Sequence, residues 1–243
     1  ITAMKKLTAA IQYECLTSFR YIWIFYLVQY LIVALICLIV AVGTGSFENI
    51  GTNCLELNTF IYVGILGALG FKEDFTTLIQ NGFTRKYIYI ATIAMFCFIS
   101  GTMAFVDTVV GNMMHLINSN YSSLYGGLYG YDNLFMNWLW LFLLYVVLCS
   151  LLYLIILVIN RVGKNVSIYL GLAFGGVILL IIALFRYVFS AELVRDIVEF
   201  LMQAMGFMTD GTINYIFPAL TLFVIVAILG IGSYAVIRRT ELK

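Results

Sequence analysis

The chain has 243 residues, of which 63% are hydrophobic and 10% are charged, and it contains one proline. About a quarter of the residues are charged in a soluble domain, so this composition and a mean hydropathy of +1.04 exclude a soluble globular protein and indicate a chain that folds in lipid. The net charge of +1 gives no reason to expect binding to nucleic acid.

Six apolar runs predict six transmembrane helices. A run of about 20 residues crosses a hydrocarbon core of about 30 Å as an α-helix, which satisfies its own backbone hydrogen bonds. The runs lack the alternating polarity of barrel strands, so we expect an all-α polytopic integral membrane protein. The predicted spans are 21–42, 57–71, 87–110, 134–159, 166–188 and 213–236, and the second is short because it covers only about 22 Å.

The basic residues predict the orientation of the spans. Cytoplasmic loops carry an excess of Lys and Arg, and most Lys and Arg of this chain fall on the cytoplasmic side when both termini are cytoplasmic. Only Arg186 and Arg195 then fall on the outer side, whereas Glu56 is expected at the outer interface. The inner side holds Lys5, Lys6, Arg20, Lys72, Arg85, Lys86, Arg161, Lys164, Arg238, Arg239 and Lys243.

The segment 4–20 has the pattern of an amphipathic helix. Apolar residues recur at every fourth position, and the opposite face is polar. This pattern predicts a helix that lies along the membrane surface, although a simple basic anchor fits as well. The apolar positions are Leu7, Ile11, Cys15 and Phe19, and the polar ones are Lys6, Glu14 and Thr17.

The inner segment 72–86 predicts a short cytoplasmic helix. Glu73 and Asp74 would lie at its start, where the helix dipole favours negative charge, and Asn81 with Gly82 supplies a left-handed stop. Arg85 and Lys86 mark the entry into the third span, and on their own they serve equally well as topology determinants.

Two outer segments complete the layout. The loop 111–133 carries tyrosines that are typical of an interfacial aromatic belt, and its single histidine, His115, is expected to be solvated rather than to bind metal. The segment 190–212 predicts an amphipathic helix at the outer interface. The tyrosines are Tyr121, Tyr125, Tyr129 and Tyr131.

Within the spans, small residues indicate helix packing and one acid is a candidate functional residue. Gly64 with Ala68, and Gly171 with Gly175, have the spacing of close helix packing. Asp107 is the one carboxylate inside a predicted span, which makes it a candidate functional residue, with a structural role as the alternative.

The sequence contains no recognisable catalytic motif. It has no phosphate-binding GxxxxGK[ST] loop, no HExxH and no Cys/His set with metal-ligand spacing, so we expect neither enzymatic activity nor a metal or cofactor bound by this chain. The scarcity of charge in the spans argues against an ion-coupled carrier.

The order of the parts, and the stretch LIQNGFTRK at 78–86, resemble the type-two permeases of ATP-binding-cassette exporters, in particular the small permeases of Gram-positive bacteria. The basic ending, Arg238-Arg239-Thr240-Glu241-Leu242, is similar as well.

The resemblance implies a permease subunit in a bacterial cell membrane. Segment 4–20 would be the elbow helix, 190–212 the outer re-entrant segment, and a second permease chain would complete the path. ATP and Mg would bind to a separate ATPase subunit, docked on the coupling segment.

The apolar spans suit an amphipathic or hydrophobic cargo such as a peptide, for export or for self-protection. A stand-alone channel or carrier and a non-transporting scaffold or immunity protein remain alternatives. The implied coupling residues are Lys72, Glu73, Asp74, Phe75, Leu78, Gly82, Arg85 and Lys86.

Overall fold

The computed structural model describes residues 2–45, 53–69, 78–80 and 82–238. These residues are all-α and form no sheet, with a single isolated bridge between Phe207 and Ile213. The prediction of an all-α fold is therefore confirmed. The helices are α1 (Thr2–Thr44), α2 (Glu56–Leu69), α4 (Arg85–Ile117), α5 (Leu124–Tyr129), α6 (Leu134–Val162), α7 (Lys164–Tyr187), α8 (Ala191–Ala204) and α9 (Ile216–Ile237).

Five of these helices are long and apolar enough to cross a membrane: α1, α4, α6, α7 and α9. The chain is therefore a multi-pass membrane protein, as its composition predicts. The described part of the second predicted span is α2, which has 14 residues and is shorter than the other five. Residues 70 and 71, with which that span was predicted to end, lie outside the described residues.

The first helix differs from the prediction at its beginning. An interfacial helix at 4–20 and a span at 21–42 were expected as two elements, but α1 is one continuous helix of 43 residues. No glycine or proline interrupts residues 2–42. At 1.5 Å per residue α1 is about 65 Å long, about twice the thickness of a hydrocarbon core. The expected polar face is also not the outward face, since Glu14 is buried whereas Leu16 is 64% exposed.

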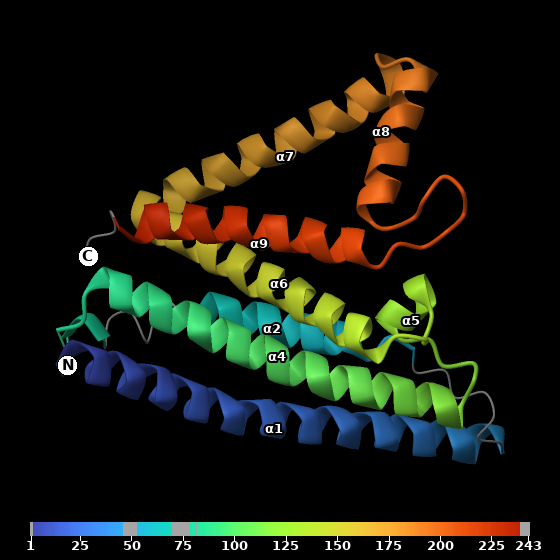
Figure 1. Ribbon diagram of the computed structural model, residues 1–243, viewed down its shortest axis with the longest axis horizontal. Coiled ribbons are helices and arrows are strands. Elements are labelled where there is room, and N and C mark those ends of the chain that lie inside the picture. Colours follow the sequence, from blue (N-terminus) through green and yellow to red (C-terminus); the bar gives the residue numbers. More distant parts are fainter. Residues whose placement is uncertain (1, 46–52, 70–77, 81, 239–243) are drawn as a thin grey trace.

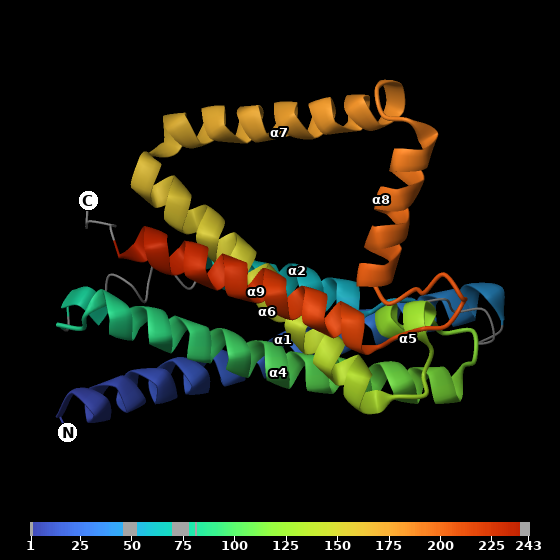
Figure 2. The ribbon, with the colours of Figure 1, turned by 45° about the horizontal axis from the view of Figure 1, so that its top comes forward.

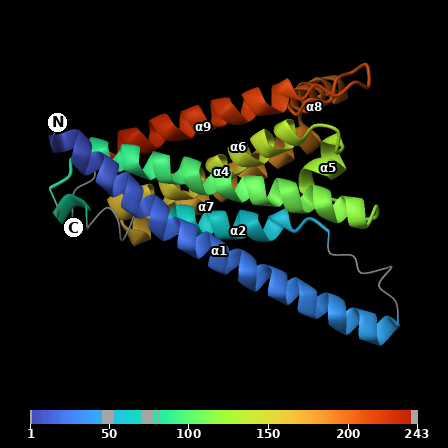
Figure 3. The same ribbon diagram turned by 60° about the horizontal axis from the view of Figure 1, so that its bottom comes forward.

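The bundle is built around α6, which contacts α2, α4 and α9, while α1 packs against α4 (Figures 1 and 3). Helix α1 begins and α9 ends at the same end of the bundle, called here the near end. Helix α4 also begins at the near end, and the short helix α5 lies at the far end.

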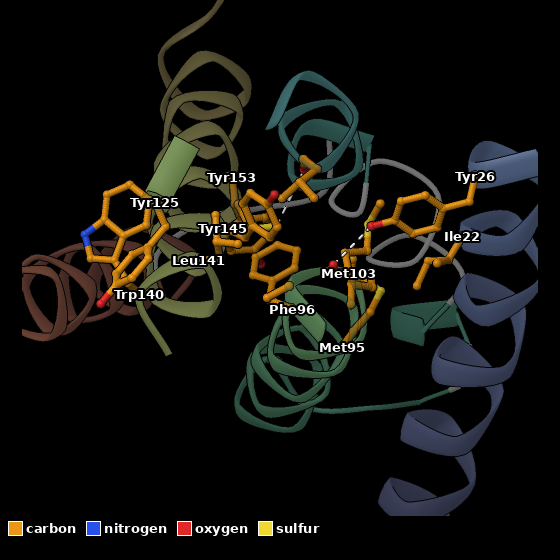
Figure 4. Packing of buried hydrophobic residues seen from close by; sticks show 14 of the residues in the cluster. Ile22, Tyr26, Met95, Phe96, Met103, Tyr125, Trp140, Leu141, Tyr145 and Tyr153 are labelled. Carbon is orange, nitrogen blue, oxygen red and sulfur yellow. Dashed lines mark hydrogen bonds between the residues drawn. The ribbon is translucent and has the colours of Figure 1, made fainter. Parts of the chain in front are cut away.

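One stripe of α6 forms the middle of the core. The stripe repeats every four residues, so its members lie on one helix face, and each is at most 2% exposed. Figure 4 shows Tyr145 and Tyr153 of this stripe close to Phe96 of α4. The stripe consists of Leu141, Tyr145, Cys149, Tyr153 and Leu157.

Helix α2 approaches α6 closely at two glycines. A Cβ added at Gly64 would lie 2.9 Å from a methyl carbon of Leu152, and one added at Gly67 would lie 2.7 Å from both Cα and O of Cys149. Gly64 belongs to the predicted packing pair, but the second close approach is made by Gly67 and not by Ala68, which is half-buried. Small residues bring the two backbones together, which is how helices associate in lipid.

Helices α7 and α8 stand away from the bundle (Figure 2). Helix α7 has no buried residue, and nothing described lies within 4 Å of a Cβ added at Gly171 or Gly175. Helix α8 confirms a helix within the predicted segment 190–212, but it ends at Ala204, and the chain then turns through Gly206, whose φ is +90°. Within the described residues, the predicted glycine pair on α7 therefore faces open space.

The glycine contact predicts an asymmetric effect of adding a methyl group. Gly67→Ala should lower thermal stability in detergent, because contact with the rigid Cys149 backbone costs about 1–3 kcal/mol and outweighs a helix-propensity gain of at most about 1 kcal/mol. Gly176→Ala is the matched control, since nothing described lies within 4 Å of its added Cβ. Equal stability of the two variants would contradict the close α2–α6 contact.

Candidate functional site

Asp107 is buried in the middle of the helix bundle. Helix α4 continues past the predicted span end at Val110 to Ile117, so Asp107 lies about 15 Å along the helix from its last residue. Its side chain is on the face of α4 that is turned toward the other helices, and the residue is only 4% exposed. Asp107 therefore lies deep within the bundle and not in the last turns of its helix.

Three hydroxyl groups from three other helices donate to the Asp107 carboxylate. Tyr26 of α1 donates to Oδ1 at 2.9 Å, and Thr59 of α2 donates to the same oxygen at 3.3 Å. Tyr145 of α6 donates to Oδ2 at 2.6 Å. The Tyr26 hydroxyl also lies 3.1 Å from the carbonyl oxygen of Met103, and Figure 4 shows this side chain reaching from α1 toward α4. One carboxylate thus joins α1, α2, α4 and α6.

These donors replace the water that a carboxylate would otherwise bind. Neither Asp107 nor Glu56 makes an ion pair with a Lys or Arg among the described residues, where the recorded ion pair joins Arg195 and Asp196. A buried charge without a counter-ion is costly unless several hydrogen bonds stabilise it. The three hydroxyls therefore account for the burial of Asp107. Without them, burial of the charged carboxylate would be unfavourable.

Glu56, which the sequence predicts at the outer interface, is a second buried acid near Asp107. It is 2% exposed, in the first turn of α2. Glu56 precedes Thr59 by one turn of α2, and its Oε1 would lie 3.0 Å from a Cβ at Gly111, one turn beyond Asp107 on α4. The two acids are therefore about one helical turn apart. Glu56 and Thr59, at i and i+3 on α2, face Asp107 and Gly111, at i and i+4 on α4. No signal in a single sequence shows that these two helix faces meet.

The tyrosines of the far end form a packed cap rather than a belt around the bundle. Tyr121, Tyr125 and Tyr129 are at most 4% exposed. His115, expected in a solvated loop, is on α4, where its ring stacks on Tyr131 at 3.7 Å and its Nδ1 lies 2.9 Å from the carbonyl oxygen of Tyr121. Burial raises the pKa of Tyr121, and the nearby Glu56 acts in the same direction.

Tyr129 connects this cap to the chain between α8 and α9. Its hydroxyl donates to the carbonyl oxygen of Met205 at 2.8 Å, and its ring stacks on Phe207 at 5.6 Å. Farther along the same turn, the hydroxyl and backbone N–H of Thr212 donate to Asp210, which lowers the pKa of that carboxyl. The α8–α9 turn is therefore ordered by hydrogen bonds and held against α5.

At the near end, the predicted helix stop at Gly82 is present. Residues 78–80 are helical, and Gly82 has a φ of +76°. Its N–H donates to Ile79 O at 2.9 Å, and the N–H of Phe83 donates to Leu78 O at 3.0 Å. This pair of hydrogen bonds is the Schellman motif, in which a left-handed residue ends a helix. Leu78, Ile79 and Phe83 also pack against the buried core of the bundle.

Arg85 joins the beginning of α4 to the end of α9. Its guanidinium donates at 2.8 Å to the carbonyl oxygen of Arg238, the residue that follows α9, where a helix dipole favours positive charge. Lys86, in contrast, is exposed. Lys72, Glu73, Asp74 and Phe75 lie outside the described residues, so the described part of the coupling segment is its second half.

An apolar groove runs along the bundle between α4, α6 and α9. Two adjoining cavities of about 330 Å³ and 580 Å³ share Cys97, Val146 and Val226 in their walls. The polar groups in these walls are few, and they include the hydroxyls of Ser150, Ser233 and Tyr89, of which the Tyr89 hydroxyl donates to Gly230 O at 2.6 Å. The groove therefore suits a hydrocarbon chain better than a polar solute.

No group of three or more His, Cys, Asp or Glu side chains that could hold a metal ion occurs in the part of the chain that the structure describes. Comparison of the chain with protein-family profiles, curated proteins and solved structures gives no match. The function must therefore be inferred from the chain's own geometry.

The contact between Asp107 and Tyr145 can be measured by a double-mutant cycle. Asp107→Ala and Tyr145→Phe should each destabilise the purified protein, and their effects should be non-additive by about 0.5–3 kcal/mol, because each removes the other's partner. Thermal unfolding in detergent provides the measurement. Asp132→Ala, at an exposed acid, is the control and should be additive with Tyr145→Phe; additivity of the Asp107 pair would contradict the hydrogen bond.

Proposed function

We propose that this chain is the permease subunit of an ATP-binding-cassette exporter and that a separate ATPase docks at the near end. The observation that supports this most is the helical segment that ends at Gly82. It closes with a Schellman motif, its apolar residues pack into the bundle, and α4 begins directly after it. A segment attached in this way can pass a displacement at the near end to the spans.

The attachments would direct that displacement to particular helices. Leu78 and Phe83 connect the segment to the core, and Arg85 connects the first turn of α4 to the end of α9. Helices α4 and α9 form two walls of the apolar groove. Motion of the coupling segment would therefore open or narrow a surface suited to an amphipathic or hydrophobic cargo, such as a peptide.

The same proposal places a second permease chain beside α7 and puts the near end on the cytoplasmic side of the membrane. An apolar helix without a buried residue, with Gly171 and Gly175 free to approach another helix, supports a second permease chain beside it. The near end would be cytoplasmic, with both termini, by the positive-inside rule. Segment 4–20 would then be the part of α1 that lies at the inner interface, and α2 would belong to the second span, 57–71.

The buried acids favour a second candidate function. The scarcity of charge in the spans argues against an ion-coupled carrier, but Glu56 and Asp107 are both buried and close together. Carriers that move protons or sodium ions use intramembrane carboxylates of this kind. Transport in liposomes by the isolated chain, driven by an ion gradient and without ATP, would favour that candidate.

The experiment is gentle purification of the tagged protein from its native membrane, followed by identification of what is recovered with it. We expect a soluble ATPase with a phosphate-binding loop. Gly82→Val should reduce its recovery several-fold, because a β-branched residue is strained at a φ of +76°. Gly82→Asn is the matched control, since Asn tolerates the left-handed conformation, and it should retain the ATPase.

Two results would contradict the proposal. One is recovery of this chain alone, under conditions in which other permeases of the same membrane retain their ATPases. The other is equal recovery of the ATPase with the Gly82→Val and Gly82→Asn variants and with variants of Glu73, Asp74 and Phe75, which would place the docking surface elsewhere.

A further inference from the structure

We propose that Glu56 and Asp107 form a protonation site in which Glu56 holds a proton, Asp107 holds a negative charge, and the bound proton keeps α1 attached to α2. This inference does not rest on the proposed exporter function. It rests on the arrangement of two acids and of the groups around them.

The two acids have unequal surroundings. Asp107 accepts hydrogen bonds from Tyr26, Thr59 and Tyr145, which stabilise a charge on it. Glu56 is equally buried, and the backbone N–H groups of Glu56 and Leu124 face its carboxyl group, but its Oε2 has no hydrogen-bond partner. A second charge would be shared by an oxygen that has no donor, about one helical turn from the first charge. Two carboxylates in such a setting ionise in separate steps.

A side chain of α1 supplies the second indication of a bound proton. Gln29 is 6% exposed, and its amide Nε2 donates at 3.3 Å to Leu55 O, in the peptide group that precedes Glu56. The Oε1 of Gln29 has no partner. Two buried acceptors, one on Gln29 and one on Glu56, are therefore close to the same peptide group and lack a donor. A proton on Glu56 would supply that donor and would connect α2 to α1.

The other groups that face the two acids cannot supply a positive charge. The side chains that face Asp107 and Glu56 come from α1, α4, α6 and the segments beside α2 and α5. Among the described residues, none of these side chains is a Lys or Arg. His115 is two turns from Asp107 on α4. Its ring stacks on Tyr131, and its Nδ1 contacts the carbonyl oxygen of Tyr121. The titratable groups that interact with Asp107 or Glu56 are Tyr26, Tyr30, Tyr145, Cys54 and Tyr121.

Loss of the proton would weaken the attachment of α1. The folded bundle binds one proton more than an arrangement in which α1 has moved away and both acids meet water. Stability of the closed arrangement is therefore greatest at low pH and falls as the pH rises through the titration of Glu56. A change of pH would shift α1 between attached and released positions.

Infrared spectroscopy of the full chain in lipid nanodiscs tests the site directly. A protonated carboxylic acid has a C=O stretching band that a carboxylate lacks. We expect the wild-type spectrum at neutral pH to contain such a band that is absent in Glu56→Gln. In Asp107→Asn the same band should remain but titrate at a pH lower by about one unit or more, because the neighbouring charge is gone. Glu192→Gln, at an exposed acid, should leave the band unchanged.

The two variants make the test independent of either one failing to fold. The proposal is overturned if wild type and Glu56→Gln have the same carboxylic acid absorption at neutral pH, because Glu56 is then ionised. It is also overturned if the band persists in Asp107→Asn with an unchanged midpoint, because the two acids are then uncoupled.

Discussion

The hydrogen bonds to Asp107 are the interaction on which the rest of the bundle depends. In lipid, apolar contact alone does not hold one helix against another, so packing and hydrogen bonds decide which helices associate. Tyr26 brings α1 to this carboxylate, Thr59 brings α2 and Tyr145 brings α6. Helix α1 otherwise packs mainly on α4, and its further contacts with α2 and the preceding Leu55 include the Gln29 hydrogen bond and the stacking of Phe25 on Tyr62.

The two ends of the bundle are closed in different ways, and this gives the molecule a direction. At the far end the buried tyrosines of α5 hold the α8–α9 turn through Tyr129. At the near end a short helical segment packs on the core, and Arg85 joins α4 to α9. Between them lies the apolar groove, while α7 extends away from the bundle. The proposed transport function rests on this combination of a fixed cap, a connected near end and an apolar groove.

The sequence was sufficient to predict the membrane class, the long helices and the helix stop at Gly82, because each depends on local chemistry. The first two depend on the length of the apolar runs, and the stop depends on one residue with a positive φ. The continuity of α1 was not predicted, since amphipathic pattern alone does not say where a helix bends. The burial of Glu56 and of the tyrosine cap was also missed. Those features depend on contacts between residues far apart in the chain, such as Glu56 with Gly111, and a single sequence does not reveal them.

The most direct test of the central role of Asp107 is the distance between α1 and α2 in the membrane. Spin labels introduced at Leu35 and Ile61, which are 62% and 64% exposed, would report it by pulsed electron resonance. The account predicts one narrow distance distribution for the wild-type background, which broadens or shifts in Asp107→Ala but not in the exposed-acid control Asp132→Ala. An unchanged distribution in Asp107→Ala would show that α1 is held by other contacts and would contradict the account.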